Sequence, residues 1–147
     1  MTGTGLATFD HTVQETNLWL KHLMPKLGHD DRELALKALR TVLHALRDSL
    51  PLAPAGRLGD QLPILLRGFY YETWRPTGMS ASILNREAFL ARIRSEFPAA
   101  FGLGLERVAK SVFEVMWELV EPGEVAKVVR LLPDDLGDLW PRVARED

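Results

Sequence analysis

The chain has 147 residues, of which 46% are hydrophobic and 26% are charged, a composition typical of one globular domain in water. It contains no cysteine, which excludes disulfides and thiolate metal sites. The formal net charge is −2 and neither half is basic, so we expect no nucleic-acid partner, because bulk electrostatic attraction to phosphates is missing.

The amino-terminal segment MTGTGLATFD lacks the basic residues and the apolar run that mark a signal peptide. Apolar runs elsewhere are only a few residues long, whereas a helix that spans a membrane needs about 20 residues. We therefore expect a cytoplasmic protein that does not cross a membrane.

The first predicted helix lies in the segment FDHTVQETNLWLKHLMPKLG. Its apolar side chains recur at helical spacing on one side, at Phe9, Val13, Leu20, Met24 and Leu27. Pro25 is expected to kink this helix or end it early, and Gly28 is expected to close it. Leu18 points to the polar side of the same helix, and Trp19 lies at the edge of that side.

An amphipathic helix, the long helix of this first group, is predicted in ELALKALRTVLHALRDSL. Its leucines form a stripe with spacings of 3, 4, 3 and 4 residues, at Leu36, Leu39, Leu43, Leu46 and Leu50. Asp30 and Glu33 resemble a capping box in front of this helix, and Pro51 ends it.

The segment QLPILLRGFYYETW closes this first group of elements. Pro63 suits the start of a helix, because the N–H that proline lacks would have no acceptor within the helix at that place. The residue before a proline is pushed out of helical geometry. We therefore predict a short helix before the Leu-Pro pair, a corner at the pair and a closing helix after it.

The second half of the chain repeats this pattern. In LERVAKSVFEVMWELVEP an apolar stripe with the same spacings lies 69 residues after the first, at Leu105, Val108, Val112, Val115 and Leu119. The closing phrase returns as LLPDDLGDLW, 70 residues after its first copy. A helix in NREAFLARIRSEFP, with Asn85 as its N-cap, precedes this second stripe, and PAAFGLG is expected to be a loop.

The repeated pattern predicts an all-α protein, a compact helical bundle of two pseudo-repeats in one domain, 1–147. Each repeat consists of a helix, a long helix, a short helix and a closing helix. The first repeat spans about 9–74 and the second about 85–140, joined by a linker at about 75–84 that contains Pro, Gly and Ser. Sustained alternation with a period of two residues is absent, so we expect no sheet.

These segments resemble the bacterial and archaeal family known as domain of unknown function 2267. The resemblance rests on an apolar long helix, a spacer and a Leu-Pro-x-x-Leu close. These appear here as ALKALRTVLHALRDSL with QLPILLRGFY, and as VAKSVFEVMWELV with LLPDDLGDLW, over roughly residues 9–140. The resemblance implies two such helical units and brings no catalytic residues with it.

Patterns for catalysis and metal binding fail on geometry. His11, Glu15 and His22 share one side of the first helix, but the two histidines lie about 16 Å apart along it. Cysteine nucleophiles are absent, and no serine sits in a Gly-x-Ser-x-Gly turn. The dipole at a helix amino terminus accounts for Asp134 and Asp135. We therefore expect no metal or cofactor and favour a non-enzymatic protein.

The segment GFYYETW places four aromatic side chains within six residues, which is more than one core contact needs. They either fill the seam between the repeats or form an exposed patch. The helix that begins at Pro63 already has an inward side, and Tyr71 and Trp74 lie on a different one. We therefore select Tyr71 and Trp74, with Leu18 and Trp19 as neighbours, as candidate residues for contact with another protein.

We consider three functions in order of preference. The first is a non-enzymatic helical interaction or structural module that acts through a protein partner or through self-association. The alternative is a small-molecule-binding or catalytic helical bundle with a pocket between the repeats, which a cavity lined by His44, Tyr70 or Tyr71 would favour. The third is a nucleic-acid binder with a local basic face, against which the charge balance argues.

Overall fold

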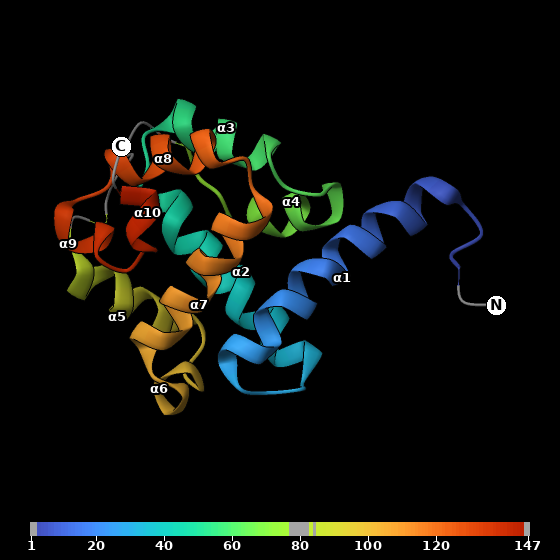
Figure 1. Ribbon diagram of the computed structural model, residues 1–147, viewed down its shortest axis with the longest axis horizontal. Helices are drawn as coiled ribbons and strands as arrows, with labels where there is room; N and C mark the ends of the chain where they lie inside the picture. Colours follow the sequence, from blue (N-terminus) through green and yellow to red (C-terminus); the bar gives the residue numbers. More distant parts are fainter. Residues whose placement is uncertain (1–2, 77–82, 84, 146–147) are drawn as a thin grey trace.

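The computed structural model describes residues 3–76, 83 and 85–145, with residue 101 described by its backbone alone (Figure 1). Within these residues the secondary structure is entirely helical, which confirms the predicted all-α bundle. The helices are α1 (Ala7–Leu27), α2 (Arg32–Asp48), α3 (Leu52–Asp60), α4 (Ile64–Tyr70), α5 (Arg86–Glu96), α6 (Ala100–Leu103), α7 (Leu105–Leu119), α8 (Pro122–Leu131), α9 (Asp134–Gly137) and α10 (Arg142–Arg145).

The cap of the long helix α2 lies one residue later than the predicted capping box. Asp31, not Asp30, is the N-cap, and its Oδ1 accepts the backbone N–H groups of Glu33 at 2.9 Å and Leu34 at 3.2 Å. This side chain satisfies two of the N–H groups that have no partner within the helix. The predicted start of α2 is therefore correct to within one residue, whereas the prediction of Asp30 as its capping residue was wrong.

The other predicted helix starts follow the sequence closely. Asn85 caps α5 by accepting the backbone N–H of Ala88 at 2.8 Å, as predicted. At the two Leu-Pro corners the prolines are the N-caps of α4 and α9, with φ of −53° at Pro63 and −55° at Pro133. Each proline therefore stands just before the helix instead of in its first turn.

Helix α1 continues through Pro25 to Leu27, so of the two predicted effects of this proline, a kink or an early end, the early end was wrong. A proline in the last turn removes one hydrogen bond, which is a smaller cost than in the middle of a helix. The end of α1 is set by Gly28, which adopts the left-handed conformation with φ 73° and donates to the carbonyl of Pro25 at 3.1 Å.

The two long helices, α2 and α7, pack against each other in the middle of the bundle, and both contact α1 and α5. The middle of each predicted stripe is fully buried, with 0% exposure at Leu39, Leu43, Leu46, Val108, Val112 and Val115. Leu66 and Leu136, which follow the two Leu-Pro pairs, are also 0% exposed. Residues from both halves of the chain therefore belong to one hydrophobic core.

The elements occur in the predicted order, α2, α3 and α4 in the first half and α7, α8 and α9 in the second. The helices that precede them differ, because α1 has 21 residues and α5 has 11. The segment PAAFGLG, predicted as a loop, contains the short helix α6. Most of the predicted linker at 75–84 lies outside the described residues. How closely the two groups of helices superpose stays a prediction.

Candidate functional site

Exposed apolar side chains gather at one end of the bundle. Eight large apolar side chains are exposed among the described residues, and four of them lie around the start of α1 and the start of α4: Leu6, Phe9, Ile64 and Leu65. Figure 1 shows that the first turns of α1 extend beyond α4, away from the other helices. We call these four residues and the surface between them the apolar end.

The apolar stripe of α1 runs from the core out into solvent. Leu20 and Leu27 are 5% and 2% exposed, because the second half of the helix packs against α2 and α7. Phe9, on the same side of the helix, is 56% exposed, and Val13 is half-buried. The core therefore uses only the second half of the stripe that the sequence displays.

The start of α4 is held against α1 by a polar contact. Thr12 Oγ1 accepts the backbone N–H of Leu65 at 2.8 Å. Thr16, one turn further on, donates its hydroxyl to the carbonyl of Thr12 at 2.8 Å. These bonds occupy polar groups on the flank of the stripe, so that the side chains of Leu65 and Val13 lie on one continuous surface.

A mainly apolar groove of about 370 Å³ continues this surface between α1, α2 and α4. Its lining residues are Val13, Thr16, Asn17, Leu20, Arg32, Glu33, Leu36, Leu65 and Phe69. Arg32 donates a hydrogen bond to the side chain of Asn17, which fixes a cation at the edge of the groove. The guanidinium of Arg40 lies 4.8 Å from the centre of the Phe69 ring. The groove thus has an apolar floor and a polar edge along α2.

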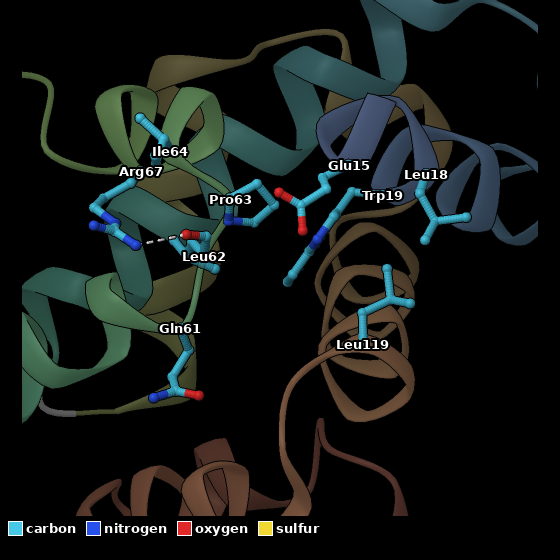
Figure 2. A pocket seen from close by; sticks show the side chains of 9 residues that line it. All are labelled: Glu15, Leu18, Trp19, Gln61, Leu62, Pro63, Ile64, Arg67 and Leu119. Atoms are coloured by element: carbon cyan, nitrogen blue, oxygen red, sulfur yellow. Dashed lines mark hydrogen bonds between the residues drawn. The ribbon is translucent and has the colours of Figure 1, made fainter. Parts of the chain in front are cut away.

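A second hollow, a cleft of about 330 Å³, lies on the opposite side of α1 (Figure 2). Leu18 and Trp19 of α1 and Leu119 of α7 form one wall, and the corner at Leu62 and Pro63 forms the other. Polar side chains are also present in its lining, at Glu15, Gln61 and Arg67. The Leu-Pro corner that the sequence repeats is therefore part of a surface feature as well as of the core.

Two of the four residues selected from the sequence meet in this cleft. Leu18 is 45% exposed and can contact another molecule directly. Trp19 is only 3% exposed and offers almost no area to a partner, so its main contact is with the core. The sequence placed Trp19 at the edge of the polar side, and α7, packed along α1, covers that edge.

The other two, Tyr71 and Trp74, line neither the groove nor the cleft, and Tyr71 lies against α3. Their rings are 5.1 Å apart and half-buried, and the Tyr71 hydroxyl donates to the carbonyl of Gly56 at 3.2 Å. A Cβ added at Gly59 would lie 2.3 Å from the Tyr71 hydroxyl oxygen, so this glycine permits the close approach. Burial, followed by the nearby Asp60 carboxylate, raises the pKa of Tyr71.

A buried cation holds the end of α4 against α2, and sequence reasoning did not identify it. Arg47 is 1% exposed, and its Nη1 donates to the carbonyls of Tyr70 at 2.8 Å and Glu72 at 2.7 Å. Asp48 accepts hydrogen bonds from Arg47 and forms an ion pair with Arg92 at 2.8 Å. Burial acts to raise the pKa of Asp48, but the hydrogen bonds from the two arginines outweigh it and lower the pKa.

His44 also contributes to the contact between α2 and the end of α4. It is 7% exposed, and its Nε2 lies 2.7 Å from the carbonyl of Phe69. Because a carbonyl only accepts, Nε2 carries the hydrogen. Nδ1 lies 3.6 Å from a carboxylate oxygen of Glu96, on α5. His44 therefore links α2 to α4 and faces α5, and it lines neither the groove nor the cleft.

The histidines of α1 pair with separate carboxylates. His11 Nε2 lies 3.4 Å from Glu15, and His22 Nδ1 lies 3.0 Å from Glu118. Burial acts to raise the pKa of Glu118, but hydrogen bonds from His22 and Lys26 outweigh it and lower the pKa. Among the described residues, no group of three or more His, Asp or Glu side chains is arranged to hold a metal ion.

None of the helices in the described part of the chain is long and apolar enough to cross a membrane. A comparison with curated proteins gave no match. A family model described as an uncharacterized conserved protein, DUF2267, matches residues 16–139 and so covers both long helices and both Leu-Pro corners. The chain therefore belongs to the domain of unknown function 2267 family.

Proposed function

We propose that the protein is a non-enzymatic helical module that acts in the cytoplasm by contact with another protein chain, through the apolar end. The observation that carries this proposal is the clustering there of four of the eight exposed large apolar side chains among the described residues. Burial of one such side chain is favourable by about 1.5–3 kcal/mol, so a surface of this kind favours association. Clustered exposed apolar side chains are typical of contact sites.

Comparison of the two Leu-Pro phrases supports the proposal. Ile64 and Leu65 follow the first Leu-Pro pair and are 65% and 38% exposed. The residues at the same two places in the second phrase are Asp134 and Asp135, which are also exposed. Folding of this corner therefore does not require apolar side chains at these places, and their presence at the apolar end calls for another explanation. Contact with a partner provides one.

Photo-crosslinking tests the proposal in cells that make the full chain. Phe9, at 56% exposure, is replaced by a photoreactive phenylalanine analogue, and Val143 on α10, at 52% exposure, serves as the matched control. We expect discrete crosslinked protein species from position 9 that are absent from position 143. Equal and weak crosslinking from both positions would contradict the proposal.

A second candidate function, small-molecule binding, is favoured by the cleft beside Trp19. Its volume of about 330 Å³ lies at the lower end of the range for ligand sites, and it combines an apolar wall with Glu15 and Gln61. A compound that binds there should raise the melting temperature of the parent and should not do so in Leu18→Lys. A compound library that leaves the parent unchanged would argue against this function.

A further inference from the structure

We infer that the partner at the apolar end is a second copy of this chain, in a two-fold dimer in which the first half of each α1 lies in the groove of the other copy. This inference rests on the proposed function and adds the identity of the partner. The shape of the surface and the charge around it both fit a second copy.

The surface carries both halves of a complementary pair. The projecting turns of α1 form a ridge that bears Phe9, and the groove begins on the same side of the same helix at Val13. In a two-fold interface the same patch is used by both copies, so each ridge enters the groove of its partner. An unrelated helix could fill the groove but would leave the ridge exposed, whereas a second copy covers both.

A rotation axis close to Val13 sets the register. Two copies of α1 then run antiparallel, and residues whose numbers add up to about 27 lie at the same height, because the helix rise is uniform. Phe9 of one copy reaches the height of Leu18 in the other and enters the groove near Leu20 and Leu36, which line it. Val13 of each copy lies beside the axis and meets its own counterpart.

The charges around the groove match this register. Asp10 and Asn17 lie two turns apart on the same flank of the stripe, within about 20° on a helical wheel. Arg32 is held beside Asn17 by its hydrogen bond. A two-fold axis through the interface keeps this flank on the same side in both copies, so Asp10 of one copy comes to the height of Arg32 in the other. The dimer thus forms two Asp10–Arg32 pairs, although Glu33 lies beside Arg32 in the groove lining.

Charge reversal tests these pairs directly, because the two reversed chains complement each other. A dimer of Asp10→Arg holds two pairs of positive charges, and a dimer of Arg32→Asp holds two pairs of negative charges. Each variant alone should therefore dimerise about tenfold more weakly than the parent or worse. A mixture of the two variants should restore association to near the parental level, because both pairs are then attractive. Light scattering measures the mass, and a melt of each variant shows that it is folded.

A disulfide crosslink between the two copies tests the position of the two-fold axis. The chain has no cysteine, so single cysteines can be introduced without a background. Val13→Cys should form a disulfide-linked dimer on mild oxidation, because a disulfide requires Cβ atoms about 3.5–4.5 Å apart. Leu18→Cys is the matched control, because Leu18 is exposed on the opposite side of α1. This variant should run as a monomer on a non-reducing gel.

A parent that light scattering finds monomeric at every concentration, or a mixture of the reversed chains that fails to associate, would overturn the inference. Crosslinks from position 9 to a different protein would do the same while leaving the proposed contact function intact. Crosslinks from position 9 that have twice the mass of the chain, together with restored association in the mixture, would support both.

Discussion

The two Leu-Pro phrases of this chain, 62–70 and 132–140, have the same spacing but different surfaces. The leucine three places after each proline is 0% exposed, at Leu66 and Leu136. The two places directly after each proline are exposed, and there the first phrase has Ile64 and Leu65 where the second has two aspartates. Packing constrains the buried places alike in both phrases, whereas the exposed places differ in polarity, and Asp135 of the second phrase accepts the backbone N–H of Arg86.

The two halves also differ inside the core, in how each long helix contacts the residues after its Leu-Pro corner. Arg47 of α2 holds the end of α4 through the carbonyl of Tyr70, whereas Met116 stands 69 residues later on α7. In the second half, Phe113 of α7 stacks on Trp140 with ring centres 4.0 Å apart and planes 5° from parallel. The first half thus joins its long helix to the residues after its Leu-Pro corner by buried hydrogen bonds, and the second half does so by stacked rings.

The largest expected effect is at the buried leucines shared by both phrases. Leu66→Asp and Leu136→Asp should each lower the free energy of unfolding by at least about 3 kcal/mol, because each loses a buried leucine and buries a carboxylate without a partner. Urea unfolding of both variants measures the loss. If only one variant were destabilised, the two phrases would not be structurally equivalent.

A somewhat smaller effect is expected where the two halves differ in the core. Arg47→Met places the residue of the second half at the equivalent position of the first and leaves the carbonyls of Tyr70 and Glu72 without their donor. We expect a loss of about 3 kcal/mol, in the range for breaking one side of a buried polar cluster. Met116→Leu, a volume-conserving change, is the control and should cost less than about 1.5 kcal/mol. Equal losses would show that the hydrogen bonds contribute little.

The fold was predictable from the sequence because the core stripes are regular. Leucines and valines at helical spacing define α2 and α7, and burial follows directly from such a pattern. The failures occurred where one side chain decides the outcome, as at Asp31, whose carboxylate caps α2 in place of the neighbouring Asp30. Arg47 was missed because it is charged, although it lies four residues after Leu43 and three before Leu50, on the apolar side of α2.

The candidate site was less predictable, because exposure depends on which helices happen to cover a given stripe. The apolar stripe of α1 gives no sign that α2 and α7 cover only its second half, so Phe9 could not be told apart from Leu27. Tyr71 was selected for its place outside the inward stripe of α4, yet Gly59 of α3 allows it to pack within the chain. Leu18 is the selected residue that the structure leaves exposed.

The stability of the protein in acid should depend in part on Asp48 of the first half. The pKa of Asp48 is lower in the folded protein than its ordinary value of 3.8, so Asp48 stabilises the fold above that pH and loses this contribution as the pH falls through its folded pKa. Asp48→Asn should therefore lower stability at pH 7 and show a shallower further loss between pH 5 and pH 2. Asp138→Asn, in the second half and exposed, is the control and should follow the parent. Identical slopes for all three proteins would show that Asp48 does not contribute to acid unfolding.

The smallest effect on folding is expected at the place where the two phrases differ on the surface. Ile64→Asp copies into the first phrase the residue that the second phrase carries at the same place. Ile64 is 65% exposed, so the change removes few intramolecular contacts and should alter the free energy of unfolding by less than about 0.5 kcal/mol. Contact at the apolar end should nevertheless weaken, because a partner would have to bury the new carboxylate. Urea unfolding combined with photo-crosslinking from position 9 measures both quantities on one variant. A stable variant with fewer crosslinks would show that Ile64 serves contact and not folding, whereas a loss of stability as large as that of Leu66→Asp would place Ile64 among the residues that hold the corner together.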